Sequence, residues 1–263
     1  MKKIELIKIL LGCCLMLSCL PLFAQNVRFT EQGVIEYEKR VNTHAVMKRM
    51  MGGGAREDGF MEEAMDGMKK KMPQFNVFKS SLSFRDQKTL FVPEVKKEDP
   101  SDMFGMGLMG KQNNIIYSDF SSASSISQRN VLDEVFLVKD SLRRMVWKIT
   151  EETRDIAGYS CRRANGLMLD SIYVVAFYTD KIPVSGGPES FSGLPGMILG
   201  VALPHENLTW FATKVTDTPV NPQVVVPPVK GKAMDGPAFK AYLTSSFKQW
   251  GSSANAFLKS LIL

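Results

Sequence analysis

The chain has 263 residues, of which 44% are hydrophobic and 23% charged, with a net charge of +6. This length can bury a sizeable core in one large domain or, less readily, in two. The charges of both signs are mixed along the chain, and no arginine-rich stripe alternates with aromatic residues, which argues against a nucleic-acid partner.

The N-terminus has the pattern of a secretory signal. A lysine-rich start and a short apolar stretch lead to Ala24, a small residue suited to the cleavage point. We expect residues 1–24 to be a signal peptide and residues 25–263 to be one β-rich domain, located in the periplasm or at the outer membrane. The apolar stretch is shorter than the ~20 residues that a membrane helix needs, so no transmembrane span is expected in the mature chain. A lipid anchor on Cys19 is the alternative to cleavage after Ala24.

Strand signals dominate the rest of the chain. Residues 33–41 alternate apolar with polar residues and place Ile35, Tyr37 and Val41 on one face. Short loops between such segments favour antiparallel neighbours. We therefore predict a mainly β protein of the α+β class, with a strongly curved antiparallel sheet or half-barrel. Further strands are predicted at 78–84, 88–92, 114–120, 135–139, 144–150, 171–179, 197–203 and 208–215.

Two helices and two irregular segments interrupt the strands. Residues 58–73 have acidic residues in the first turn and lysines in the last, which predicts a helix, and we expect it to pack across the sheet. Residues 237–250 carry an apolar stripe and predict a C-terminal helix. Residues 94–112 are predicted to be a mobile insert. The proline-rich residues 219–236 are predicted to be an edge strand or an extended tail.

Methionines are unusually abundant, with 16 in the chain. On the predicted helix they recur at spacings of three and four residues and therefore share one face. One interpretation is that this face packs the helix on the sheet, because methionine is an adaptable filler. Another is a deformable surface for an apolar ligand, a peptide or an envelope protein. The ligand-facing residues would then be Phe60, Met61, Met65 and Met68.

A soft-metal site is a further interpretation of the methionines. Met103, Met106 and Met109 are spaced three apart in the glycine-rich insert, as in a flexible thioether clamp. Thioethers select Cu(I) and need no deprotonation to bind it. The chain's two histidines are far apart in the sequence, which excludes a histidine-rich zinc site. Apart from Cu(I), no cofactor is expected.

Cys161 would be the single cysteine left after cleavage, so no intramolecular disulfide is expected. It lies in a predicted strand, where a free cysteine behaves as a small buried hydrophobe. A nucleophilic Cys161 is the alternative, but Arg162 stands where a nucleophile elbow needs glycine. The phosphate-binding and metalloprotease motifs that would suggest other enzymes are absent from the sequence. A non-enzymatic protein is therefore favoured.

A glycine-rich corner precedes the most apolar segment of the chain. Leu194, Pro195 and Gly196 predict a type II turn, with Pro195 at the second position and Gly196 at the third, where φ must be positive. Gly193 lets the backbone pass close to a neighbour. We interpret these four residues as a rigid corner that sets the register of strand 197–203. A lip that contacts a ligand is the alternative.

The wider stretch resembles a known family. Trp147-Lys-Ile149, Gly158-Tyr-Ser-Cys161, Ala176-Phe-Tyr-Thr179 and Leu194-Pro-Gly-Met197 stand at the spacing typical of the GLPGLI family of exported Bacteroidota proteins, with Met197 in place of leucine. The resemblance implies a signal peptide and a location in the cell envelope. It implies no established activity, cofactor or catalytic residue, so no functional residue is carried over.

These observations predict an uncharacterised exported protein that binds an apolar, peptide or protein ligand in the concavity of its sheet, without catalysis. Binding in the concavity is inferred by analogy with lipoprotein-carrier-like half-barrels. A Cu(I)-handling protein is the first alternative, and an enzyme that depends on Cys161 is the second.

Overall fold

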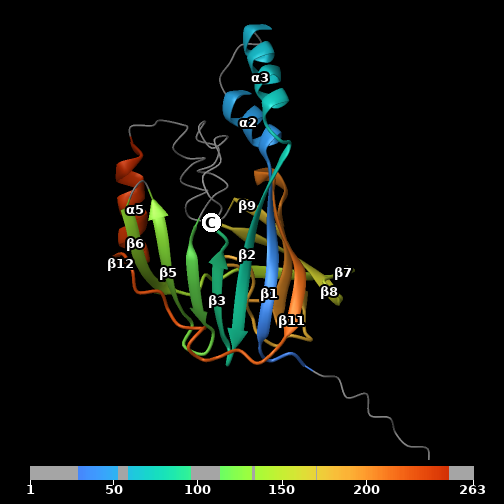
Figure 1. The fold of residues 1–263 in the computed structure, drawn as a ribbon, viewed down its shortest axis with the longest axis vertical. Coiled ribbons are helices and arrows are strands. Elements are labelled where there is room, and N and C mark those ends of the chain that lie inside the picture. The colour runs from blue at the N-terminus through green and yellow to red at the C-terminus, as the bar shows by residue number, and fades with distance from the viewer. Residues whose placement is uncertain (1–28, 53–58, 96–112, 132–133, 170, 249–263) are drawn as a thin grey trace, which may run out of the picture.

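Twelve strands form one sheet in the order β12-β6-β5-β4-β3-β2-β1-β11-β10-β9-β8-β7 (Figure 1). The computed structural model describes residues 29–52, 59–95, 113–131, 134–169 and 171–248. Within these ranges the sheet has two edges, β12 and β7, and is not closed. Its strands are β1 (Gly33–Asn42), β2 (Phe75–Arg85), β3 (Lys88–Pro93), β4 (Ile115–Asp119), β5 (Ser124–Val131), β6 (Glu134–Ser141), β7 (Val146–Ile156), β8 (Tyr159–Met168), β9 (Ile172–Thr179), β10 (Met197–Leu203), β11 (Leu208–Asp217) and β12 (Lys232–Asp235).

The mainly β class and the predicted strands are confirmed, and β10 begins and ends where the sequence predicts. One strand, β5, escaped prediction, whereas β12 lies in the segment 219–236 that was predicted to be an edge strand or an extended tail. β5 is rich in serine, and it forms because β4 and β6 supply antiparallel partners on both of its sides. β12 pairs with β6 in parallel, which is the exception in an otherwise antiparallel sheet. It lies at the edge of the sheet, as expected for a segment that follows several prolines.

The alternation in β1 explains which face of the sheet is buried. Its odd-numbered residues are buried and its even-numbered residues are half-buried or exposed. β9 and β10 are buried along nearly their whole length, as expected for strands covered on both faces. Cys161 on β8 is fully buried in the core, as expected for a packed residue.

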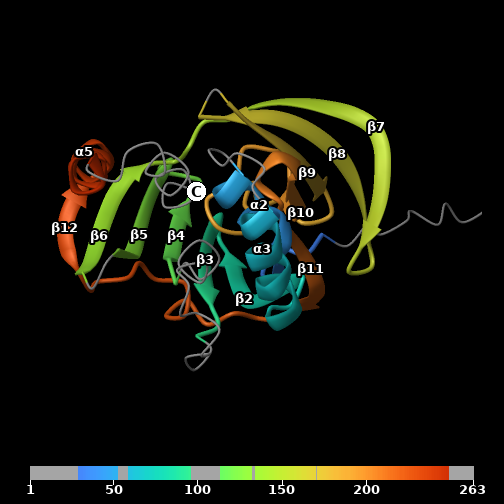
Figure 2. The same cartoon turned by 90° about the horizontal axis from the view of Figure 1, so that it is seen from above.

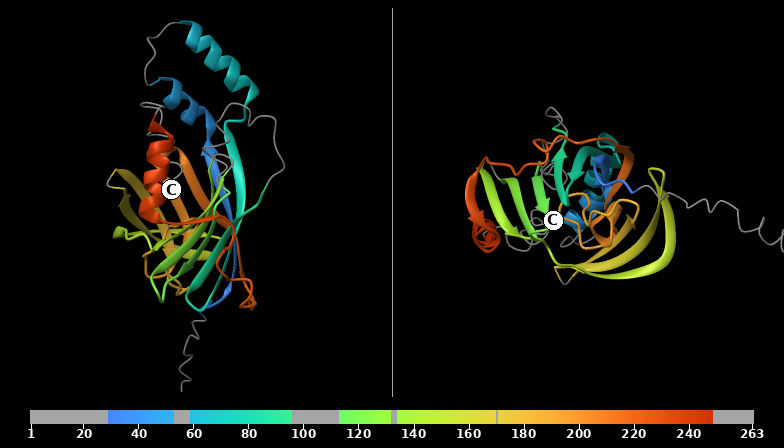
Figure 3. Two further views of the ribbon diagram at one scale, coloured as in Figure 1. Left: turned by 90° about the vertical axis from the view of Figure 1, so that its left-hand side faces the viewer. Right: turned by 90° about the horizontal axis from the view of Figure 1, so that it is seen from below.

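The sheet bends strongly, so that its two ends face different sides of a hollow. Seen from above, β7 and β8 arch round one side, while β12, β6 and β5 form another (Figure 2). The view from below shows the same arch of yellow strands (Figure 3). Tyr37 spans the interior: its hydroxyl donates a 2.7 Å hydrogen bond to the Ile198 carbonyl on β10, two strands away from β1.

Residues 180–196, which we call the inner loop, fill this hollow. Ile182 and Val184 belong to one cluster of the core, and Phe191 and Leu194 belong to the other. The Trp147 indole on β7 donates a 2.9 Å hydrogen bond to the Ser192 carbonyl, which ties the loop to the far end of the sheet. The inner loop therefore occupies part of the concavity that was expected to hold a ligand.

The helix predicted at residues 58–73 is present as α3 (Gly59–Lys71), preceded by α2 (Thr43–Gly52). It does not lie across the sheet. Figure 1 shows α2 and α3 beyond the ends of the strands. The physical reason is the pairing of β1 with β2, which runs without interruption from Gly33 opposite Phe84 to Asn42 opposite Phe75. The helices that connect these two strands must therefore start at their shared end.

The predicted C-terminal helix is α5 (Gly236–Ser246). The Asp235 side chain caps it by accepting a 2.7 Å hydrogen bond from the Ala238 backbone N–H. Its predicted apolar stripe is buried and packs against β6, where the rings of Phe239 and Phe136 are 5.5 Å apart. The short helix η2 (Pro204–Glu206) joins β10 to β11. Within the described ranges, every helix is too short or too polar to cross a membrane.

Candidate functional site

Lys39 occupies a position on β1 where an apolar residue would be expected. It lies between Tyr37 and Val41 on the inward face and is as buried as they are. Its neighbours in register are Trp210 on β11 and Phe78 on β2. The ammonium group stands 4.9 Å from the centre of the Trp210 ring, a distance at which the ring attracts a cation. A charged group is thus held inside an aromatic part of the core.

Glu189 on the inner loop is the counterion of Lys39. The ammonium and carboxylate groups are 3.6 Å apart, and the two side chains are only 8% and 3% exposed. Glu189 has φ +53°, in the left-handed region that non-glycine residues seldom adopt. Such a conformation costs about 1–3 kcal/mol and persists only where its surroundings enforce it. The inner loop therefore holds this carboxylate at Lys39 against a local backbone preference.

The charge state of the pair follows from two opposed effects. Burial lowers the pKa of Lys39 from its ordinary 10.5, and the Glu189 carboxylate raises it in return. The carboxylate thus keeps the ammonium charged in a place that favours the neutral amine.

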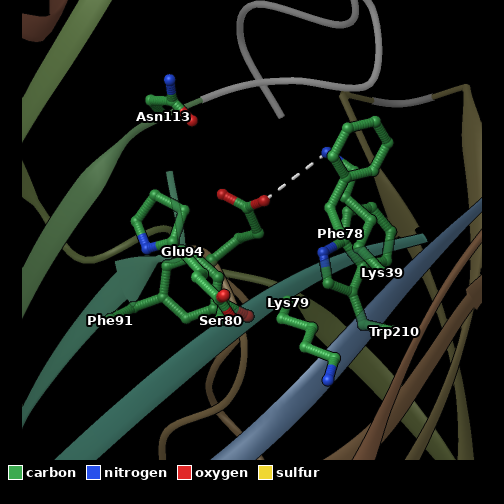
Figure 4. Close-up of a pocket in the computed structure, with 10 residues that line it drawn as sticks. Lys39, Phe78, Lys79, Ser80, Phe91, Glu94, Asn113 and Trp210 are labelled. Carbon is green, nitrogen blue, oxygen red and sulfur yellow. Dashed lines mark ion pairs between the residues drawn. The ribbon is translucent and has the colours of Figure 1, made fainter. Parts of the chain in front are cut away.

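A small pocket of about 20 Å³, space enough for about one water molecule, lies beside this ion pair (Figure 4). Figure 4 shows Lys39, Phe78 and Trp210 toward one side and Phe91 and Asn113 toward the other, with the dashed ion pair between them. Three aromatic rings thus surround a charged centre. The lining residues are Lys39, Phe78, Lys79, Ser80, Phe91, Pro93, Glu94, Asn113, Glu189 and Trp210.

Three buried polar atoms of this pocket lack a hydrogen-bond partner among the described residues. They are the Ser80 hydroxyl, the Glu189 Oε2 atom and the Trp210 indole Nε1. The three side chains all line the pocket, and each residue is more than nine-tenths buried. Buried polar atoms in native proteins are nearly always satisfied, if not by protein then by water or a ligand. The pocket can therefore offer one acceptor, one donor and one hydroxyl to a guest molecule.

The sequence-predicted ligand residues do not contribute to this pocket. Met68 is half-buried on α3, beyond the ends of the strands. The side chains of Phe60, Met61 and Met65 lie outside the described part of the structure. The surface that these residues were predicted to form remains a prediction.

The predicted copper residues Met103, Met106 and Met109 also lie outside the described residues. Across the described ranges, no group of three or more histidine, cysteine, aspartate or glutamate side chains is placed to hold a metal ion. The thioether site is a different donor set, so the Cu(I) hypothesis stays a prediction.

The corner of Gly193, Leu194, Pro195 and Gly196 differs from the predicted type II turn. The Gly196 N–H donates to the Leu194 carbonyl at 2.8 Å, which closes a three-residue turn about Pro195. The Met197 N–H, which a type II turn would use, donates instead to the Ile182 carbonyl at 3.0 Å. Gly196 has φ +149°, and a Cβ atom there would lie 2.1 Å from the Thr179 carbonyl oxygen. Leu194 is buried, so the corner anchors the inner loop in the core.

The environment of Cys161 does not favour a nucleophilic thiolate. Its thiol donates a 3.4 Å hydrogen bond to the Tyr159 carbonyl. Burial, aided by the charge of Asp155, raises the pKa of this thiol from 9.0 to about 12, so the reactive thiolate is disfavoured.

Sequence reasoning missed Lys39, Ser80, Glu189 and Trp210. One signal was available for the first of them. The period-two alternation of β1 that selects Ile35, Tyr37 and Val41 also selects Lys39, and a charge on an apolar strand face is unusual. Nothing local marks Glu189, because its burial depends on the path of the inner loop.

A family model described as a protein of unknown function (Porph_ging) matches residues 167–200. This stretch runs from the end of β8 through β9 and the inner loop into β10. It overlaps the region on which the resemblance to the GLPGLI family rests. No curated protein matches the chain.

Among solved structures, the chain is similar to PNGF-II in two crystal forms. The TM-scores are 0.50 and 0.48, each at 16% sequence identity. Each alignment covers 80% of this chain and 32% of the PNGF-II chain, so this protein spans about a third of the length of PNGF-II. At this identity the likeness concerns the fold alone. The chain thus carries a match to a family of unknown function on a mainly β fold distantly similar to part of PNGF-II.

Proposed function

We propose that the protein is a non-catalytic, exported binding protein whose pocket beside the Lys39–Glu189 pair holds a short peptide segment. On binding, the aromatic rings that line this small pocket move apart to admit an apolar side chain of the peptide, and the adjoining peptide group meets the polar atoms. The observation that carries this proposal is the set of three buried, unpartnered polar atoms in one aromatic pocket.

The chemistry of these atoms suits a peptide group. A backbone N–H can donate to Glu189 Oε2, and a backbone carbonyl can accept from the Trp210 indole N–H. The Ser80 hydroxyl can take either role. Leaving such groups unsatisfied costs about 1–3 kcal/mol each, so a ligand that pairs them gains affinity.

The electrostatics of the pocket favour a neutral ligand. Lys39 and Glu189 neutralise each other, and the more exposed Lys79 and Glu94 on the lining also have opposite charges. A net charge on the guest would have no matching countercharge. An uncharged peptide segment with an apolar side chain avoids the cost of burying an unpaired ion.

The proposed location of the protein in the cell envelope is supported by the N-terminal signal pattern and by the resemblance to the GLPGLI family. In the cell envelope, segments of other proteins and their degradation products are the available peptides.

The experiment titrates the ¹⁵N-labelled protein with acetylated, amidated tripeptides that have apolar, polar or charged central residues. The indole N–H resonance of Trp210 reports on the pocket, and the other two tryptophans serve as internal references. We expect neutral tripeptides with an apolar centre to shift the Trp210 resonance. Charged centres should have a weaker effect.

Two serine variants provide the control. Ser80 and Ser81 are adjacent on β2, but only Ser80 faces the buried side. Ser80→Ala should weaken tripeptide binding about ten-fold, the equivalent of one lost hydrogen bond. Ser81→Ala should leave it unchanged. If no tripeptide moves the Trp210 resonance, or if both variants weaken binding equally, the proposal is wrong.

A further inference from the structure

A second and larger cavity lies on the other side of the inner loop. It has a volume of about 700 Å³, is open to solvent, and lies between β4, β5, β6, the start of α5 and Ser190 of the inner loop. It shares no lining residue with the pocket beside Lys39, although Ser190 directly follows Glu189. Serines and basic residues dominate its wall. The polar and charged members are Ser118, Ser125, Ser127, Arg129, Asp140, Ser141, Arg143, Arg144, Ser190 and Lys240.

Two arginines form the inner part of this cavity, and both are held in place. The Arg129 Nε atom donates to the Ser127 hydroxyl at 3.1 Å, and its guanidinium stands 5.9 Å from the centre of the Phe239 ring. Arg143 donates from Nη1 to the Met168 sulfur at 2.8 Å. Both side chains are half-buried, and Ser127 is buried. Arg129 on β5 and Arg143 in the connection between β6 and β7 are thus each held by a hydrogen bond to a neighbouring side chain.

The cavity has an excess of positive charge. Arg129, Arg143, Arg144 and Lys240 line it together with one carboxylate, that of Asp140, and the charge of Glu189, next to Ser190, also acts on Arg129. Asp140 also accepts a 2.8 Å hydrogen bond from the Ser141 backbone N–H.

The charges of Arg129 and Arg143 repel each other. Burial and the charge of Arg143 lower the pKa of Arg129 to about 10, with Glu189 and Asp140 opposing the shift. At neutral pH both guanidinium groups therefore remain charged. Two like charges at one cavity destabilise each other, and a bound anion relieves this repulsion.

We propose that this cavity binds a ligand through an oxyanion group, that is a phosphate, sulfate or carboxylate, held between Arg129 and Arg143. Guanidinium groups bind such oxyanions with paired, charge-assisted hydrogen bonds. The serine hydroxyls supply further donors around the oxyanion. The size of the cavity leaves room for a larger molecule attached to this group.

The test measures binding by calorimetry at constant ionic strength, with inorganic phosphate, phosphoserine, sulfate and citrate as separate probes. Inorganic phosphate alone separates a free-anion site from one that needs an attached molecule, for which phosphoserine or citrate should bind more tightly. We expect at least one of these probes to bind. Failure of all four would overturn the proposal.

Arg143→Gln and Arg162→Gln form a matched pair that removes the same charge at two places. Arg162 is exposed on β8 and lies 3.6 Å from Glu151, outside the cavity. Arg143→Gln should weaken oxyanion binding about ten-fold or more, whereas Arg162→Gln should change it less than about two-fold. Equal weakening by both would show that only the overall charge attracts the anion, and would overturn the site.

Two further variants guard against ambiguous results. If Arg143→Gln does not fold, Arg143→Lys keeps the charge but loses the planar guanidinium and should still weaken binding. Unchanged binding by a folded Arg143→Lys variant would count against guanidinium recognition. Ser80→Ala, in the other pocket, should leave oxyanion binding intact, so the two sites can fail or succeed independently.

Discussion

Removing the Glu189 carboxylate tests how much the buried ion pair between Glu189 and Lys39 stabilises the folded protein. Glu189→Ala leaves the Lys39 ammonium buried without its counterion, at a site where the two side chains are 8% and 3% exposed. Loss of one partner of a buried pair costs about 3–5 kcal/mol. We therefore expect the free energy of unfolding to fall by this amount at neutral pH.

The backbone conformation of residue 189 predicts a further difference between two variants at this position. Glu189 has φ +53°, so a glycine there relieves about 1–2 kcal/mol of left-handed strain. The greater freedom of glycine in the unfolded chain offsets about 0.4–1 kcal/mol of this gain. Glu189→Gly should therefore be more stable than Glu189→Ala, the reverse of the usual order. The double variant Lys39→Met/Glu189→Ala should recover most of the loss, because no charge is left buried.

The pH dependence of the free energy of unfolding provides a second, independent test of the ion pair. Burial lowers the pKa of Lys39 below 10.5 in the folded protein. Between this lowered pKa and the pKa of the unfolded chain, the unfolded chain binds more protons than the folded protein. The contribution of Lys39 to the free energy of unfolding therefore rises with pH in this range. Glu189 opposes that shift, so Glu189→Ala should lower the pKa of Lys39 further. The variant should regain stability relative to wild type as the pH rises from neutral toward 10.

Urea unfolding of the four proteins across this pH range is the assay. A loss below about 1 kcal/mol in Glu189→Ala would mean that the carboxylate does not stabilise the buried ammonium. A double variant no more stable than the single one would refute the reasoning as a whole.

Further predictions concern the core and the glycines, all measured by urea unfolding. Burial raises the pKa of the Cys161 thiol from 9.0 to about 12, so between these pH values the free energy of unfolding of the wild type should fall by about 1.4 kcal/mol per pH unit. Cys161→Ala should not show this fall. Equal slopes in the two proteins would contradict the prediction. Gly196→Ala should lower the free energy of unfolding by about 3 kcal/mol, because its Cβ atom would lie 2.1 Å from a carbonyl oxygen. Gly67→Ala in α3 should raise it by about 0.5–1 kcal/mol, because a Cβ atom there has nothing within 4 Å. The opposite ranking of the two variants would contradict the prediction. Ser80→Ala should raise stability by about 1 kcal/mol relative to Ser81→Ala, since it removes an unpartnered buried hydroxyl, and a loss would show that the hydroxyl is satisfied.

Several features of the fold are readable from local sequence because they depend on periodicity. The alternation of β1 predicts an inward face, and the apolar stripe of α5 predicts a buried one, and both are found. The same alternation places Lys39 inward. The strand pattern thus held a signal for this buried charge, although the sequence analysis did not use it.

Other features depend on which distant segments meet. The turn about Pro195 takes its form from the hydrogen bond between Met197 and the Ile182 carbonyl, which no pattern within the turn predicts. The place of α3 follows from the pairing of β1 with β2 over their full length.

The sequence alone thus determined a strand-rich chain with a signal-like start, an apolar inward face on β1 and a glycine-proline corner before β10. Only the tertiary structure decided that this corner carries an inner loop into the hollow of the sheet, where Glu189 meets Lys39 and where Ser80 and Trp210 complete a pocket. The physical reason is that periodicity determines the face on which a side chain lies, whereas its partner across the core depends on long-range packing and on the path of the loop.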